Sequence, residues 1–240
     1  MMEKRSKFVS AIILIGWMIL SQIPLIAIIG ILGMSSQMGL WTNIVLTAIY
    51  LVIVLGIAWL IRRYYLKHSV EQPLKFNGRD IWINIGWAVL LRLVVALGSY
   101  VMFMVTGDVQ TENDKVLMGD LNEKGGELAH IIPFVVFLLS IGIIIPFMEE
   151  LIYRGIFKET LFKREMFWLP LIITSIVFGG MHVSNNLISF GIYFTMGLIL
   201  YLSYSRRNNI KDSMMVHMIN NSIIAIVMLV NYIIVYFNLF

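Results

Sequence analysis

The chain has 240 residues, of which 59% are apolar and 13% are charged, and its mean hydropathy is +0.86. Soluble domains carry about 25% charged residues, so this composition excludes an ordinary soluble protein. The segments of about ten residues with alternating polarity that a membrane β-barrel requires do not occur in the sequence. The absence of cysteine excludes disulfides, thiol catalysis and cysteine-ligated metal.

Apolar runs that reach the roughly 20 residues needed to cross a bilayer occur along most of the chain. They lie at 8–33, 40–61, 81–106, 131–157, 166–184, 186–204 and 213–238. We therefore predict an all-α, polytopic transmembrane helical bundle of about seven or eight spans. No repeat or soluble linker divides the chain, so residues 1–240 are expected to form a single integral membrane domain. The first run resembles a secretory signal, but it continues to about Leu32 without a small-residue cleavage site, which favours an uncleaved span.

The charges between the apolar runs favour one orientation in the membrane. The N-terminal segment and the loop 62–80 are basic, whereas the loop 107–130 carries six acidic residues against two lysines. Because lysine and arginine remain on the cytoplasmic side, we expect the N-terminus and 62–80 inside and 107–130 outside. The basic turn 205–212 then falls inside, as the alternating count of spans requires. The basic residues are dispersed rather than gathered on one face, so the expected partner is the lipid bilayer and not a nucleic acid.

Three charged residues, Glu149, Glu150 and Arg154, lie at the end of a long apolar run. Charged side chains at membrane depth are costly and normally face a bundle interior or a wet cavity, so they mark a candidate functional site. On an α-helix Glu150 and Arg154 share one face and can pair, whereas Glu149 is rotated by about 100°. One arginine cannot hold both carboxylates equally well, so we expect different acid–base roles for the two glutamates. The alternative to a functional site is an ion pair at the membrane interface that caps a helix and has no role in chemistry.

Two histidines lie near the edges of later apolar runs. Phe178 precedes His182 by one helical turn, and the glycine pair at 179–180 permits close helix approach or a local break. His217 and Asn221 are again four residues apart on one face, from which Asn220 is turned away. An asparagine amide in this position can orient a water or donate to a developing oxyanion. Taken alone, His182 has the alternative of a hydrogen-bonded core residue, and His217 that of hydrogen bonding between helices.

Together the three segments resemble the CPBP family of intramembrane proteases, which includes the type II CAAX prenyl endopeptidases and the bacterial Abi proteins. The motifs of that family are Glu-Glu-x-x-x-Arg, Phe-x-x-x-His and His-x-x-x-Asn. All three occur here in the same order, at 149–154, 178–182 and 217–221. The resemblance covers roughly residues 131–225, which would form the protease core.

The resemblance implies an intramembrane endopeptidase that cleaves a membrane-associated peptide or protein. Glu149 would activate the attacking water, His182 and His217 would assist, and Asn221 would stabilise the tetrahedral oxyanion. Glu150 and Arg154 would position the site. For the bacterial branch it suggests peptide maturation or self-immunity to bacteriocins. A CAAX prenyl endopeptidase, a non-enzymatic membrane partner and a transporter are the alternatives.

The need for a metal stays open at the level of sequence. Two histidines and one glutamate match a catalytic zinc site in ligand type. The His-Glu-x-x-His helix motif is absent, however, and a glutamate-activated water needs no ion. Zinc is therefore compatible with the residues but not required, and no ligand is assigned.

Two features of the sequence bear on the candidate site: the depth of His182 in the membrane and the position of Arg92 within a span. Counting spans places Glu149 near the inner face and His182 nearer the outer face, about 24 Å from the start of its span. Their convergence requires a shifted helix start, a strong tilt, or a break at Pro146 or at the glycine pair 179–180. Arg92, in the middle of the run 81–106, is expected to face protein or water. It would pair with a carboxylate of the site or bind a substrate carboxyl terminus. The alternatives are a structural partner, or a side chain that extends along the helix to the membrane surface.

Overall fold

The structure, a computed structural model, describes residues 6–69, 71, 74–118 and 128–237, and all regular elements in these residues are helices. The five N-terminal residues, on which part of the predicted orientation rests, lie outside this range. Contacts divide the chain into two compact units. The first unit comprises Met1–Ser69, Gly126–Leu161 and Asn221–Phe240, and the second comprises Val70–Gly125 and Phe162–Asn220.

Six helical stretches within the described residues are long and apolar enough to cross a bilayer, at Lys7–Gln37, Leu40–His68, Gly78–Thr106, Ile131–Leu161, Leu187–Ser205 and Ile210–Tyr236. They confirm a polytopic helical membrane protein. The predicted span 166–184 is shorter than expected, because helix α8 (Trp168–Gly180) has 13 residues and is thus about 20 Å long. The glycine pair ends this helix, and the polar residues 184–186 continue the turn.

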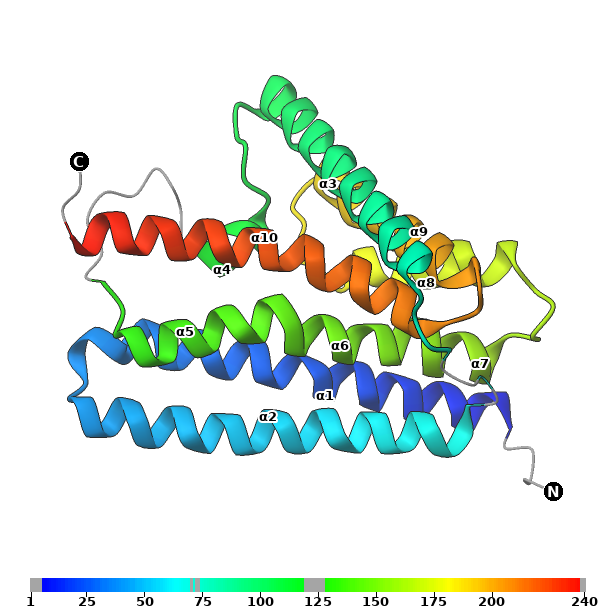
Figure 1. Cartoon of the computed structure of the whole chain (residues 1–240), viewed down its shortest axis with the longest axis horizontal. Coiled ribbons are helices and arrows are strands. Elements are labelled where there is room, and N and C mark those ends of the chain that lie inside the picture. The colour runs from blue at the N-terminus through cyan, green and yellow to red at the C-terminus, as the bar shows by residue number, and fades with distance from the viewer. Residues whose placement is uncertain (1–5, 70, 72–73, 119–127, 238–240) are drawn as a thin grey trace. The chain divides into compact units, whose positions relative to one another are not determined.

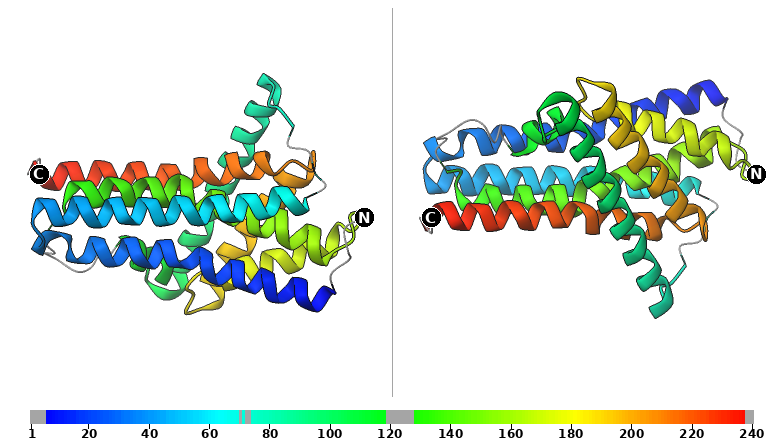
Figure 2. Two further views of the ribbon diagram at one scale, coloured as in Figure 1. Left: turned by 90° about the horizontal axis from the view of Figure 1, so that it is seen from below. Right: turned by 90° about the horizontal axis from the view of Figure 1, so that it is seen from above.

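The first unit contains three helical rods that lie side by side (Figures 1 and 2). They are α1 (Lys7–Met34), which continues into η1 (Ser35–Gln37), α2 (Leu40–His68), and a rod at 131–161. A stripe on α1, spaced at three to four residues, exposes large apolar side chains: Phe8, Ile12, Ile15, Ile19, Ile23 and Ile26. Such a stripe suits contact with lipid. The opposite side of α1 buries Leu14, Met18 and Ile28 against the unit.

The rod 131–161 is interrupted by two π-helical segments. It runs through α5 (Ile131–Leu139), the π-helical segment η2 (Ser140–Ile144), α6 (Ile145–Glu150), the π-helical segment η3 (Leu151–Phe157) and α7 (Lys158–Leu161). π-Helical segments are rare and often occur at functional sites. The two glutamates of the first motif lie at the end of α6, directly before η3.

Pro146 accounts for the first of these interruptions. Its ring nitrogen carries no hydrogen, so it cannot donate to the carbonyl of Gly142, four residues earlier. Helix α10 (Ile210–Tyr236) supplies other donors at this point. The Asn221 side chain donates from Nδ2 to the Ile141 carbonyl at 3.1 Å, and the Ser222 hydroxyl lies 3.5 Å from the Gly142 carbonyl. Two side chains of α10 therefore stabilise the irregular part of the rod.

The second unit is built around an antiparallel hairpin of α8 and α9 (Leu187–Ser205), with α3 (Gly78–Thr106) packed against α9. Glycines allow the two backbones of the hairpin to approach closely. A Cβ atom on Gly197 would lie 2.9 Å from Cα of Ser175, and one on Gly179 would lie 3.0 Å from the backbone nitrogen of Phe194. The hairpin turn at 181–186 carries His182, so this close packing sets where the histidine lies within the unit.

A cluster of charged side chains joins α3, the end of α9 and the start of α10 in the second unit. Asp212 is fully buried and accepts two hydrogen bonds from Arg207, both at 2.9 Å. Arg207 and Arg206 also donate to Asp80, at 2.6 and 3.1 Å, and Asn84 donates to Asp212 at 2.8 Å. Two arginines and two aspartates balance in charge, which makes their burial tolerable.

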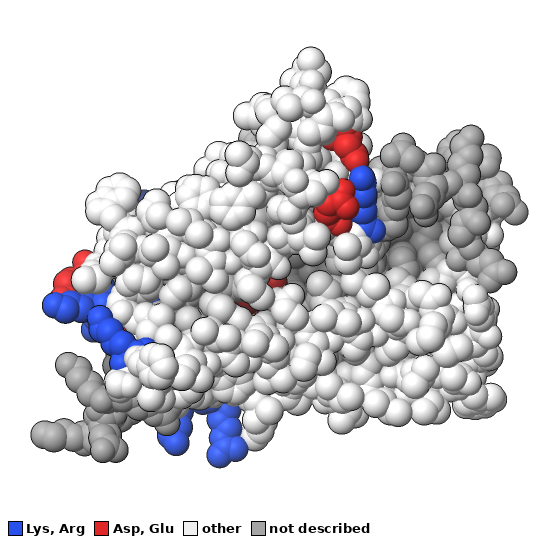
Figure 3. Space-filling view, turned by 180° about the vertical axis from the view of Figure 1, so that it is seen from behind, with Lys and Arg blue, Asp and Glu red and all other residues white. Residues whose placement is uncertain are grey.

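On the face shown in Figure 3, acidic and basic side chains gather at a few places on a largely uncharged surface.

Candidate active site

The first unit contains a fully buried ion pair. Arg154 Nη1 donates to Glu150 Oε1 at 3.0 Å, and neither side chain is exposed to solvent. The pairing that the four-residue spacing predicted is therefore present. The guanidinium of Arg154 also lies 5.8 Å from the centre of the Tyr153 ring, within the range of a cation–π contact.

Glu149 has a different environment from its neighbour. It is half-buried, whereas Glu150 is completely buried. All seven residues of η3, which begins directly after the two glutamates, are buried. The segment thus holds one carboxylate in an ion pair inside the unit and leaves the other with partial access to its surface.

The two histidines meet at one aromatic ring in the second unit. The Phe178 ring is fully buried and lies 4.6 Å from the His182 ring and 5.8 Å from the His217 ring, measured between ring centres. His217 is 1% exposed and His182 is half-buried. Asn220, which the spacing turned away from the His217 face, is also buried, at 1% exposure. The second and third motifs are therefore neighbours in space although 35 residues separate the histidines in the chain.

The hydrogen bond of His182 determines its tautomer. Its Nδ1 lies 2.7 Å from the carbonyl oxygen of Phe178, an acceptor, so the neutral ring carries its hydrogen on Nδ1. Nε2 is then the nitrogen that can accept a proton. The ring of Tyr193 stacks on the same imidazole, with centres 4.3 Å apart and planes 13° apart. Sequence reasoning did not identify Tyr193, because nothing in its apolar surroundings distinguishes it from the other tyrosines.

The predicted site residues divide between the two units. Glu149, Glu150, Arg154 and Asn221 belong to the first unit, and His182 and His217 belong to the second. The division falls inside α10, which carries His217 and Asn221 one helical turn apart. Helix α8 ends at Gly180, so the chain leaves helical geometry at the glycine pair before it reaches His182. Pro146 is accompanied by a change to π-helical geometry rather than by a chain break.

The residues that the structure describes contain no group of three histidine, aspartate or glutamate side chains that could hold a metal ion. Arg92, the arginine in the middle of α3, is half-buried. The acidic group whose charge acts on it is Asp114 of α4 (Glu112–Met118), in the same unit.

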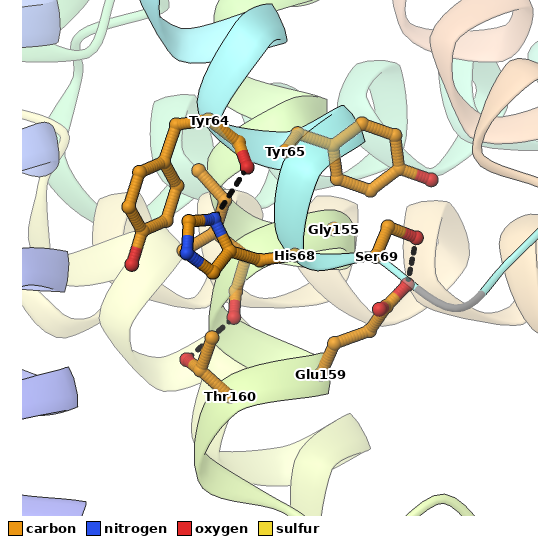
Figure 4. A pocket seen from close by; sticks show the side chains of 8 residues that line it. Tyr64, Tyr65, His68, Ser69, Gly155, Glu159 and Thr160 are labelled. Carbon is orange, nitrogen blue, oxygen red and sulfur yellow. Dashed lines mark hydrogen bonds between the residues drawn. The ribbon is translucent and has the colours of Figure 1, made fainter. Parts of the chain in front are cut away.

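A small surface pocket of about 170 Å³ lies in the first unit, between the end of α2 and the segments η3 and α7 (Figure 4). It is lined by Tyr64, Tyr65, His68, Ser69, Gly155, Ile156, Glu159 and Thr160. Within it the Ser69 hydroxyl donates to Glu159 at 2.7 Å, and His68 lies 2.8 Å from the Tyr64 carbonyl. None of the predicted site residues lines this pocket, so it is not part of the candidate active site.

One family of known proteins is similar to part of this chain. Residues 131–223 match the family described as type II CAAX prenyl endopeptidase Rce1-like. This match contains all three motifs and falls on the segment 131–225 that the motifs delimit.

Three curated bacterial proteins are similar to this chain. YdiL of Bacillus subtilis, whose name describes a membrane peptidase, is 24% identical over 82% of this chain and 75% of its own length. YvdC of Lactococcus lactis is 28% identical over 65% of this chain and 60% of its own length. The membrane-embedded CAAX protease MroQ of Staphylococcus aureus is 26% identical over 69% of this chain and 64% of its own length. No solved structure matches the chain.

Proposed function

We propose that this chain, whose residues 131–223 match the Rce1-like family, is a CPBP-type intramembrane endopeptidase that uses a water activated by Glu149. Its substrate is a peptide or protein held at the membrane. The observation that carries the proposal is the buried Glu150–Arg154 ion pair beside the half-buried Glu149. Buried charges are expensive to maintain in a membrane protein and are typical of functional sites.

In the proposed reaction Glu149 accepts a proton from water as the water oxygen attacks the carbonyl carbon of the scissile peptide. The new carbon–oxygen bond places negative charge on the carbonyl oxygen, and a side-chain N–H of Asn221 stabilises that charge. The carbon–nitrogen bond then breaks, and the proton passes to the leaving amine. His182 and His217 assist these proton transfers, and His182 does so through Nε2 because Nδ1 donates to Phe178.

Glu150 and Arg154 position the catalytic glutamate and do not react. Their ion pair links the last residue of α6 to η3 and so restricts the backbone next to Glu149. Asn221 has a second task in this account, since its hydrogen bond to the Ile141 carbonyl stabilises η2. A fixed geometry of this kind matters, because misplacing a catalytic group by about 1 Å can lower the rate about 100-fold.

For the biological role we propose the maturation of a secreted peptide or self-immunity to a bacteriocin. The supporting observation is the similarity to bacterial membrane proteins, one of them named a CAAX protease and one described as a membrane peptidase. The CAAX prenyl endopeptidase reading requires prenylated substrates, which nothing in this chain indicates.

The test compares membrane and secreted peptides from cells that carry the wild-type chain or Glu149→Ala, using mass spectrometry. The exposed Glu165 provides the matched control, because Glu165→Ala removes a carboxylate from a surface loop. We expect at least one cleavage product to disappear in Glu149→Ala and to remain in Glu165→Ala. Identical peptidomes at equal protein levels would contradict the enzyme and leave a non-enzymatic partner as the better account.

We also propose that the N-terminus lies in the cytoplasm, with 62–80 inside and 107–130 outside. The chain contains no cysteine, so single cysteines can report accessibility without background. Both Lys67 and Val109 are exposed. A membrane-impermeant thiol reagent should label Val109→Cys in cells with an accessible outer face, and Lys67→Cys only after permeabilisation. The reverse pattern would refute the orientation.

A further inference from the structure

The His182 imidazole is held on two sides within the second unit. At one edge, Nδ1 donates to the Phe178 carbonyl at 2.7 Å. On one face, the Tyr193 ring lies nearly parallel to the imidazole, with the ring centres 4.3 Å apart. A ring stacked on the face of an imidazole restricts its tilt, which a hydrogen bond at its edge does not do by itself. Tyr193 therefore contributes to the direction of Nε2.

Tyr193 is itself anchored by its hydroxyl. The side chain is buried, and its hydroxyl lies 2.8 Å from the Thr111 hydroxyl and 3.5 Å from Asp114 Oδ1. Thr111 and Asp114 are bound to each other in turn. The Asp114 amide donates to the Thr111 hydroxyl at 3.0 Å, and the Thr111 amide donates to Asp114 Oδ2 at 3.0 Å. The anchor is thus a closed set of hydrogen bonds at the start of α4.

The same short helix also contacts the turn that carries the histidine. The Asn185 side chain donates to Glu112 Oε1 at 2.9 Å. The amide of Ser189 donates to the Asn186 side chain at 2.8 Å, which caps α9. The segment 111–114, far away in sequence, therefore holds both the stacking ring and the hairpin turn.

We infer that Tyr193 is a positioning residue, which uses its ring to orient the His182 imidazole and its hydroxyl, bound to Thr111, to fix that ring. This inference rests on the proposed function, because it gives His182 a catalytic task. The ring and the hydroxyl have separable effects. Tyr193→Phe keeps the stacked ring and removes the hydroxyl, whereas Tyr193→Leu removes the ring.

The first measurement is independent of catalysis. The chain has four histidines, so selective labelling of histidine in detergent micelles gives a simple NMR spectrum, in which His182→Gln identifies the His182 signals. In Tyr193→Leu we expect the ring-current shift of the His182 Cε1 proton to be lost and its Nδ1–H tautomer to become less populated. In Tyr193→Phe both should change in the same direction but less, because the stacked ring remains and only its anchor to Thr111 is lost. Tyr201, a buried tyrosine of the same helix that packs on Phe167 and Tyr204, gives the control Tyr201→Leu, in which the His182 signals should not change.

The second measurement is cleavage of a quenched fluorescent peptide that spans the bond found in the peptidome comparison. Tyr193→Leu should lower kcat about tenfold with KM changed less than about twofold, which is the size expected for the loss of one aromatic contact. Tyr193→Phe should restore most of the rate, and Tyr201→Leu should keep it. A general loss of packing would instead lower the rate in both leucine variants.

The outcomes separate this inference from the proposed function. Unchanged His182 signals in Tyr193→Leu would overturn the positioning role. A wild-type kcat in Tyr193→Leu, together with loss of cleavage in His182→Ala, would also overturn it while the proposed function stands. Full cleavage in both Glu149→Ala and His182→Ala would overturn the proposed function, and with it the catalytic meaning of any change in the His182 signals.

Discussion

Replacing Arg154 with methionine should lower the free energy of unfolding by about 3–5 kcal/mol, because it leaves the Glu150 carboxylate buried without its cation. The magnitude follows from burial: the pair is 3.0 Å long and both side chains are 0% exposed. Domains unfold with only about 5–15 kcal/mol, so this loss is a large part of the total. Glu150→Met should cost a similar amount by stranding the arginine.

The double variant Glu150→Met/Arg154→Met distinguishes the two contributions of the pair. Replacing a whole buried ion pair by apolar groups is often neutral or stabilising, so the double variant should unfold within about 1 kcal/mol of wild type or above it. Additive losses would instead amount to about 6–10 kcal/mol, and the difference is the coupling of the two side chains. If the pair positions Glu149, the stable double variant should still cleave at least about tenfold more slowly.

The assay is unfolding in mixed micelles with increasing denaturing detergent, followed by tryptophan fluorescence. The surface pair of Asp108 and Lys115, at 2.6 Å, serves as the control, since its side chains are 31% and 24% exposed. Asp108→Asn should leave the unfolding midpoint nearly unchanged, because exposed pairs contribute little. An Arg154→Met protein as stable as wild type would refute the burial argument. A stable double variant with full activity would refute the positioning role.

Three further predictions concern the second unit. Gly197→Ala should destabilise the protein by about 1–3 kcal/mol, because its Cβ would lie 2.9 Å from the α8 backbone. Gly191→Ala is the control in the same unfolding assay. Its Cβ would meet nothing within 4 Å, so this variant should be neutral or stabilising. Arg207→Lys should lower the free energy of unfolding by about 1.5–3 kcal/mol, because lysine cannot make two parallel hydrogen bonds to the buried Asp212. An unfolding midpoint equal to that of wild type would contradict this prediction. The hydrogen bond from Lys115 holds the pKa of Asp108 below its usual value, so the contribution of this pair to stability should be present at neutral pH and lost as the pH falls through that lowered pKa. A carboxyl NMR titration of Asp108 in wild type and in Lys115→Met measures this lowering of the pKa. It should become smaller in the variant but not vanish, because the Gln110 amide still donates to the carboxylate.

The sequence by itself determined the features that depend on composition and on local spacing. Apolar content and run length established a helical membrane protein, and the four-residue interval between Glu150 and Arg154 predicted their ion pair. Helical geometry repeats within one turn, so it brings such residues together wherever the helix lies. The order of the three motifs pointed to the protease family in the same way, since it is read directly along the chain.

Tertiary structure decided the contacts that join distant segments. Asn221 and Ile141 are 80 residues apart, and Thr111 and Tyr193 are 82 apart, yet both pairs are hydrogen-bonded. No local period relates such positions, because their distance depends on how whole helices pack. The end of α8 before His182 and the π-helical geometry around Glu149 and Glu150 belong to the same category. Gly179, near the end of α8, packs against the backbone of α9, and side chains of α10 donate to carbonyl groups of η2.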